Sequence, residues 1–277
     1  MAKRQHRRAG AALVTAVLAA GACATGCSGG GATLDGPPAA DPVGTLRRAA
    51  DTLVDAGTSK ARTSMEMATG GTRVTIRGEG VYDYRGRLGR LRVMLPLDPA
   101  GASEHRPITE LLAPGALFMK NRGAGVPADK WVRVDTATLS DGNLVTGGAT
   151  DPLAAADVLR GTRTATYVGA TELAGTEVRH YRGTADLAAA ARGASGANRG
   201  VLAAAAKGFA TSAVPFDVYL DDQGRIRKIR HRFSFLTGQH RGTVAVASTT
   251  LLYDFGITAD VRLPAGRDIY DGEIAEG

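Results

Sequence analysis

The two cysteines of this 277-residue chain, Cys23 and Cys27, are the first residues whose type and spacing could do chemistry. Thiols four residues apart could form a disulfide, hold a metal ion or accept a covalent modification. A disulfide here would close only a few residues, so it would restrict the unfolded chain very little. A structural zinc site needs further Cys or His ligands, and the next histidine along the chain is His105. Covalent modification of one thiol is therefore the favoured interpretation.

The residues around the cysteines resemble a bacterial lipoprotein signal. A basic start at residues 3–8 precedes the uncharged stretch Ala9–Ala22, which is shorter than the ~20 residues of a membrane-spanning helix. Ala24-Thr25-Gly26 then leads into Cys27, as in a lipobox. This resemblance implies that the sulfur of Cys27 receives a diacylglyceryl group and that the signal is cut just before it. Cys23 is the second candidate.

This interpretation divides the chain into three parts. Residues 1–26 are predicted to be the signal peptide, residues 27–41 a flexible tether rich in Gly, Ala and Pro, and residues 42–277 a single folded domain. Loss of the four basic residues in the signal lowers the formal net charge from +7 to +3. We therefore expect an extracytoplasmic protein held on the cell membrane by its lipid.

Other residues that could do chemistry form no recognisable active site. His105, His180, His231 and His240 do not have the spacing of metal ligands, and we interpret those on predicted strands as structural. Asp221-Asp222 could pass for an acid/base pair, but Gly224 follows it and favours a hairpin turn. No nucleophile elbow or phosphate-binding loop occurs. The sequence predicts no enzyme, no metal and no cofactor, and its scattered basic residues predict no nucleic-acid binding.

The hydrophobic pattern predicts many strands and a few helices. Helices are expected at residues 42–57, 151–160, 185–192 and 201–210. Strands are expected at residues 64–68, 72–77, 81–84, 88–95, 116–121, 130–135, 164–169, 176–183, 215–221, 226–236 and 244–255. Most successive strands are joined as hairpins, so the pattern indicates an α+β fold with a large antiparallel sheet. An Ala-rich helical layer would cover its apolar face.

The order of several motifs resembles that of the actinobacterial lipoproteins related to LppX and LprG. The likeness covers roughly residues 43–264, and its motifs are GEGVYDY (78–84), ALFMKNRGAGVPADKWVRVD (116–135), the segment 151–187, VPFDVYLDDQGRIRKIRHRFSF (214–235) and LLYDFG (251–256). The resemblance implies a LolA/LolB-like half-barrel, in which a curved antiparallel sheet is covered on its concave face by a few α-helices. It further implies an apolar cavity that binds acyl chains of lipids or lipoglycans for transport or presentation.

Two functions stay open at this stage. The first is a lipid-binding lipoprotein, acting as a monomer, whose cavity is lined by apolar strand residues. The predicted lining residues are Met65, Met67, Ile76, Val93, Met119, Ile229, Phe233, Phe235, Leu251 and Tyr253. The second is a surface-binding or sensory lipoprotein with a filled core and no lipid cargo. The single tryptophan, Trp131, could pack in the core or line the mouth of a ligand site, and packing is favoured.

Overall fold

The structure is a computed structural model that describes residues 39–69, 72–96, 106–121, 125–146, 149–194, 196–236 and 243–271. These described residues belong to one compact unit. The predicted signal peptide, both cysteines and most of the tether lie outside the described residues, as do His105 and His240. The role assigned to Cys27 therefore stays a prediction.

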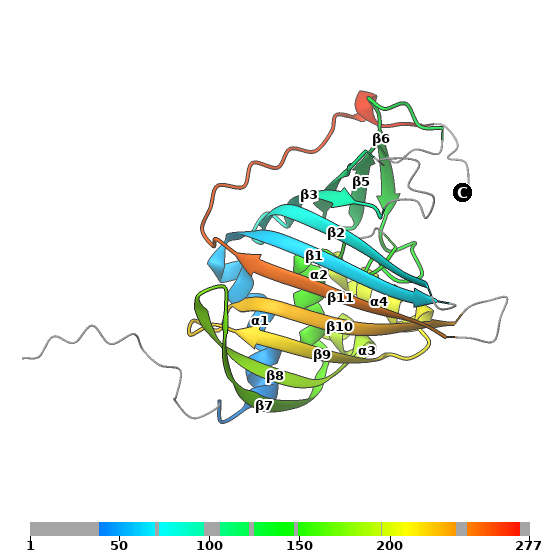
Figure 1. The fold of residues 1–277 in the computed structure, drawn as a ribbon. Helices are drawn as coiled ribbons and strands as arrows, with labels where there is room; N and C mark the ends of the chain where they lie inside the picture. Colours follow the sequence, from blue (N-terminus) through cyan, green and yellow to red (C-terminus); the bar gives the residue numbers. More distant parts are fainter. Residues whose placement is uncertain are drawn as a thin grey trace, which may run out of the picture. The chain divides into compact units, whose positions relative to one another are not determined.

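Eleven strands form one open antiparallel sheet in the order β6-β5-β4-β3-β2-β1-β11-β10-β9-β8-β7 (Figure 1). The strands are β1 (Thr58–Thr69), β2 (Thr72–Asp83), β3 (Leu88–Met94), β4 (Ile108–Ala113), β5 (Ala116–Lys120), β6 (Trp131–Asp135), β7 (Thr162–Leu173), β8 (Thr176–Asp186), β9 (Ala213–Leu220), β10 (Ile226–Leu236) and β11 (Thr243–Tyr253). Nearly all neighbours in the sheet are also neighbours in the chain. The exception is β1 beside β11, which joins the first and the last strand.

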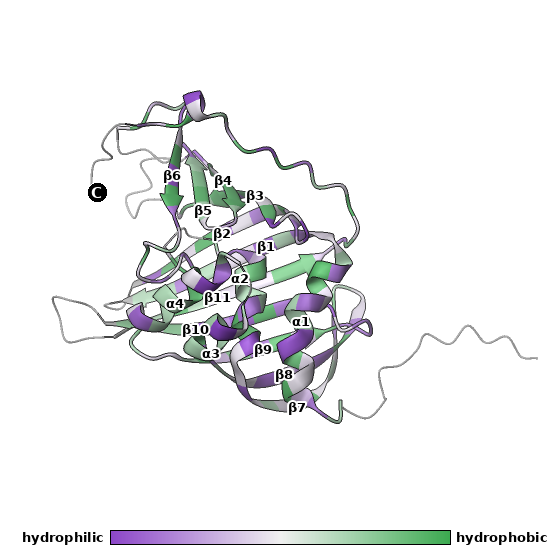
Figure 2. Ribbon diagram, turned by 180° about the vertical axis from the view of Figure 1, so that it is seen from behind, coloured by the Kyte–Doolittle hydropathy of each residue, from purple (hydrophilic) through white to green (hydrophobic). Residues whose placement is uncertain are grey.

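Four α-helices lie on one face of the sheet. They are α1 (Pro42–Ala56), α2 (Pro152–Val158), α3 (Leu187–Gly193) and α4 (Asn198–Gly208), with short 3-10 turns η1 (Leu159–Gly161) and η2 (Gly266–Asp268). Figure 2, drawn from behind, shows these helices in front of the strands. We call the face they cover the concave face and the other the convex face. This arrangement confirms the predicted α+β fold, a helix-covered half-barrel.

Local sequence signals account for the ends of the first two helices. Asp41 accepts a hydrogen bond from the backbone N–H of Gly44 at 2.8 Å, and Asp151 accepts one from that of Leu153 at 2.7 Å. Both are followed by a proline, which suits the first turn of a helix. Gly57 ends α1 at φ +83°, a conformation that glycine adopts without strain. The predicted starts of both helices are confirmed.

The structure corrects two strand predictions. The segments predicted at residues 72–77 and 81–84 are one strand, β2, which runs through Gly78 and Gly80 without a break. Gly80 is required there because a Cβ on it would collide with the carbonyl oxygen of Arg90 on β3. Strand β4 was not predicted, although it precedes Pro114-Gly115, and Gly115 has φ +71° in the turn into β5.

Trp131 does not pack beside the helices. It is half-buried on the convex face, where it belongs to a small apolar cluster with Leu111 and Phe118. The cluster is covered by residues 256–271, which we call the C-terminal strap and which run from the end of β11 to β6 (Figure 1). The predicted position of Trp131 in the main core is therefore wrong, because the register of β6 directs its side chain to the convex face. Among the residues that the structure describes, no helix is both long and apolar enough to cross a membrane.

Candidate functional site

The ten predicted lining residues lie on two opposite faces of the sheet. Strand register places eight of them on the concave face, under the helices: Met65, Met67, Ile76, Val93, Met119, Ile229, Phe233 and Phe235. Leu251 and Tyr253 alternate with the buried Leu252 on β11, so they lie on the convex face. Their side chains therefore cannot share one cavity with the other eight, and the ligand role of all ten stays a prediction.

The concave face is packed tightly against the helices. Met65, Val93 and Ile229 are each at most 1% exposed. Leu46 and Leu53, on the inner side of α1, are fully buried in the same core. Helices and strands thus leave no exposed surface at these positions, whereas Met67, Ile76 and Phe235 on the same face are half-buried.

One part of this core is polar. Ser248 on β11 and Thr150 before α2 share a hydrogen bond of 2.6 Å between their hydroxyl oxygens. His231 lies opposite Ser248 in the strand register, is 1% exposed, and its Nε2 has no hydrogen-bond partner within the described residues. Burial lowers the pKa of His231 to about 3 because a charged imidazolium would lose its hydration. His231 is therefore a buried residue of the core, and its structural role stays a prediction.

An aromatic cluster links the predicted residues to helix α4. Phe209, which follows α4 directly, stacks on Phe233 with ring centroids 4.8 Å apart. It also lies 4.5 Å from the ring centroid of Phe235 in a tilted arrangement. Phe209 was not among the predicted lining residues, because the sequence alone does not show that the end of α4 lies over β10.

An apolar hollow lies between α3 and α4. Four alanines line it, Ala188 and Ala191 from α3 and Ala203 and Ala206 from α4. Its volume is about 380 Å³, within the range of small-molecule sites, roughly 300–1,000 Å³. The hollow exists because both helices present alanines to each other, so their short side chains leave space between the backbones.

Three basic side chains surround this hollow, which we call the α3–α4 hollow. Arg192 lies in the last turn of α3, Arg199 in the first turn of α4 and Lys207 in its last turn. Among the described residues that line it, none is acidic. Arg199 has one weak hydrogen bond, from Nη2 to the carbonyl oxygen of Ala194 at 3.5 Å. The arrangement therefore offers an apolar floor and a cationic rim.

The remaining candidates contact neighbouring strands and turns. His180 Nε2 lies 2.8 Å from Asp217 Oδ1, and its ring stacks on Tyr219. Burial opposes ionisation of Asp217, but hydrogen bonds from Arg182, His180 and Arg232 lower its pKa to about 2. Asp221 accepts hydrogen bonds from the backbone N–H groups of Gln223 and Arg225, which confirms the predicted hairpin turn.

Comparisons with known proteins find similarity to solved lipoprotein structures. No protein-family model and no curated protein matches the chain. The chain is similar to Mycobacterium tuberculosis lipoprotein LppX at 10% identity and TM-score 0.46, covering 79% of this chain and 97% of that one. It is similar to LprF from Mycobacterium bovis at 12% identity and TM-score 0.41, covering 83% and 100%. A LolA superfamily protein from Nitrosomonas europaea gives 13% identity and TM-score 0.35, covering 77% and 94%.

Proposed function

We propose that this protein is an extracytoplasmic lipoprotein, tethered to the membrane through Cys27, that binds an anionic amphiphile in the α3–α4 hollow. The apolar tail occupies the space between the alanines, and the acidic head group is held at the cationic rim. The role is that of a binding or carrier protein and requires no catalytic group.

The observation that carries the proposal is the combination of lining residues in one hollow. Alanine methyl groups favour an alkyl chain because its burial removes apolar surface from water. Arg192, Arg199 and Lys207 favour a carboxylate or phosphate, since charge-assisted hydrogen bonds are stronger than neutral ones. A neutral or cationic amphiphile would gain the first contribution only.

Native mass spectrometry of the full chain, released in the gas phase from an uncharged detergent, tests this proposal. Dodecyl phosphate is expected to add its mass at concentrations at least about tenfold below those needed for dodecanol, because one charge-assisted hydrogen bond is worth that factor. The Arg199→Glu variant is expected to lose the preference, whereas Arg48→Glu on α1 keeps it. Equal binding of both compounds would contradict the proposal.

A filled core favours a second candidate function. Because Met65, Val93, Ile229 and Phe233 are at most 2% exposed, the protein could bind partners through its surface and carry no lipid. The two functions differ in how the full chain responds to Ala206→Trp, which fills the α3–α4 hollow. Loss of dodecyl phosphate binding in a folded variant supports the amphiphile site, and a wild-type chain that binds no amphiphile supports the surface-binding function.

A further inference from the structure

Two hollows on the convex face meet at the same residues. The first has a volume of about 550 Å³ and lies over β1, β2 and β3, between Tyr253 and Thr109. The second, of about 410 Å³, lies between β4 and the C-terminal strap and reaches Trp131. Arg90 and Thr109 line both hollows, so the two form one groove, which we call the convex groove.

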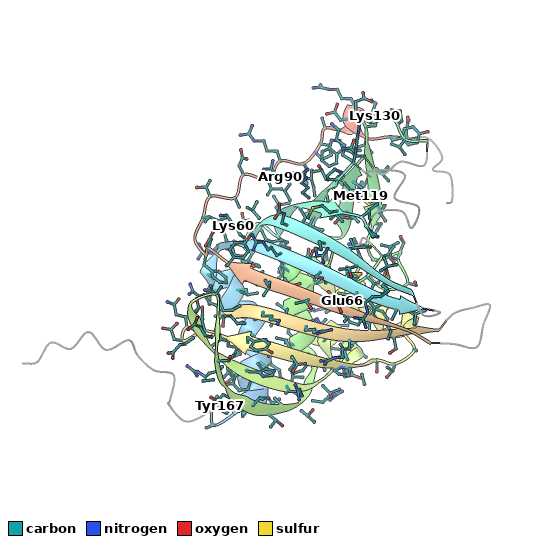
Figure 3. The ribbon with its side chains drawn as sticks, in the orientation of Figure 1. Lys60, Glu66, Arg90, Met119, Lys130 and Tyr167 are labelled. Carbon is teal, nitrogen blue, oxygen red and sulfur yellow. The ribbon has the colours of Figure 1, made fainter. Side chains whose placement is uncertain are left out.

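The strand register explains why this groove is basic. Tyr253, Lys60, Val81 and Arg90 face one another on β11, β1, β2 and β3. Arg92 lies two residues after Arg90 and therefore points to the same face. Figure 3 shows Lys60 and Arg90 at the end of the sheet that lies nearest the strap. The floor of the groove thus carries cations on alternate strands, roughly 10 Å apart at the usual strand spacing.

The strap forms the wall of the second hollow and is fixed at both ends. The backbone N–H of Gly256 donates a hydrogen bond to the carbonyl oxygen of Thr58 at 3.0 Å. The backbone N–H of Tyr270 donates one to the carbonyl oxygen of Trp131 at 2.7 Å. Between these points the strap contributes Asp260 and Arg262, which pair with each other at 3.1 Å. The wall therefore adds no net charge.

The basic groups at the centre of the groove are available for a ligand. Within the described part of the chain, Arg90 and Arg92 have no carboxylate within ion-pair distance, and both side chains are exposed. Glu79, although it is Arg92's cross-strand neighbour, forms no ion pair with it either. Thr109 adds a hydroxyl group that can donate and accept a hydrogen bond.

The backbone of the floor is already occupied. Strands β1, β2 and β3 are each paired on both sides, so the floor presents no open sheet edge to an added peptide strand. A ligand must be recognised through side chains: guanidinium groups, a hydroxyl, a carboxylate and the rings of Tyr253 and Trp131. Guanidinium groups match carboxylates in bidentate geometry, hydroxyl and carboxylate groups match sugar hydroxyls, and aromatic rings match the apolar C–H faces of pyranose rings.

We propose that the convex groove binds an acidic oligosaccharide in an extended conformation. Its acid groups pair with Arg90 and Arg92, its hydroxyls bond to Thr109 and Glu79, and its rings contact Trp131 or Tyr253. The site is separate from the α3–α4 hollow, because its residues come from the other face of the sheet. Because the groove is hollow and has the strap as its wall, a chain-like ligand fits it better than a flat membrane surface does.

Trp131 is the chain's only tryptophan, so its fluorescence reports directly on the second hollow. The full chain, held in an uncharged detergent, is titrated with oligogalacturonate of about ten sugars, and calorimetry checks the affinity. A change in tryptophan emission is expected with oligogalacturonate and not with maltodecaose, its neutral counterpart. Arg90→Gln/Arg92→Gln is expected to weaken binding at least about tenfold, because two charge-assisted hydrogen-bonding groups are lost.

A control variant removes the same charge elsewhere. Arg163→Gln/Arg230→Gln changes two arginines outside the groove and is expected to bind within about twofold of the wild type, as distant sites act independently. Equal loss in both double variants would overturn the proposal by showing a non-specific charge effect. Equal affinity for oligoglutamate of the same charge would overturn it in favour of an acidic peptide. Failure of oligogalacturonate to bind would overturn it as well.

Discussion

Between pH 7.5 and pH 5.0, His231 should lower the free energy of unfolding of the wild type by about 2 kcal/mol. Replacing His231 with leucine should remove this loss. The imidazole is 1% exposed, and burial lowers its pKa from 6.5 to about 3. In the unfolded chain the same group is hydrated and takes up a proton as the pH falls through its ordinary pKa. Acid therefore favours the unfolded state.

The sign and size follow from proton linkage. Because the pKa is lower in the folded state, the stability that this group contributes is complete above pH 6.5 and falls as the pH drops toward about 3. At pH 5.0 the pH lies roughly 1.5 units below the ordinary pKa of histidine. Protonation of His231 in the unfolded chain then stabilises the unfolded state by about 1.4 kcal/mol for each of these units, which gives about 2 kcal/mol. Leucine has no titrating group and a similar volume, so stability at pH 7.5 should be equal or higher.

Urea unfolding of the wild type and of His231→Leu at both pH values measures the difference. Asp151 also titrates in this range, because burial raises its pKa to about 6, but it does so in both proteins and cancels. Asp217, with a pKa of about 2, matters only below this range. If both proteins lose the same stability on acidification, the reasoning from the buried, unpartnered Nε2 is refuted.

Three further substitutions and one control variant test the packing of the fold. Phe209→Ala should cost about 3 kcal/mol of unfolding free energy, since it removes the aromatic ring that joins α4 to β10. Asp141→Ala should cost about 2 kcal/mol, because this buried carboxylate accepts backbone hydrogen bonds of 2.6–3.0 Å; the exposed Asp222→Ala should cost under about 0.5 kcal/mol. Gly80→Ala should cost about 3 kcal/mol, because the new methyl group would push β2 away from Arg90. Each value is measured by urea unfolding at pH 7.5.

Separate results would contradict these three predictions. A Phe209→Ala variant as stable as the wild type would show that α4 is not held by the aromatic cluster. Equal losses in Asp141→Ala and Asp222→Ala would show that burial of the carboxylate does not matter. Wild-type stability of Gly80→Ala would show that β2 and β3 can separate without cost.

Local signals in the sequence predicted many of the elements correctly. Capping by Asp41 and Asp151, each followed by proline, is decided within a few residues and does not depend on the rest of the fold. The turn at Asp221 is likewise a local arrangement of one carboxylate and its neighbouring N–H groups. Such features are readable because both partners lie within one turn of chain.

Other features depended on contacts between distant strands. The sequence favoured a break in β2 at its glycines, whereas the close approach of β3 is what requires Gly80. The side of the sheet to which Leu251 and Tyr253 point is set by the register of β11 against β1 and β10. A shift of one residue in that register would exchange the two faces, so the pattern of apolar residues on one strand could not decide it.

By itself, the sequence determined the class of fold, the starts of α1 and α2 and the end of α1, because caps, turns and alternating strands are short-range properties of the chain. Only the tertiary structure decided which hollows exist and what surrounds them. The α3–α4 hollow needs two helices side by side, and the convex groove needs six strands and the strap in register. In the convex groove, Lys60, Arg90 and Arg262 are distant in the chain, and the packing of the sheet and the strap brings them around one space.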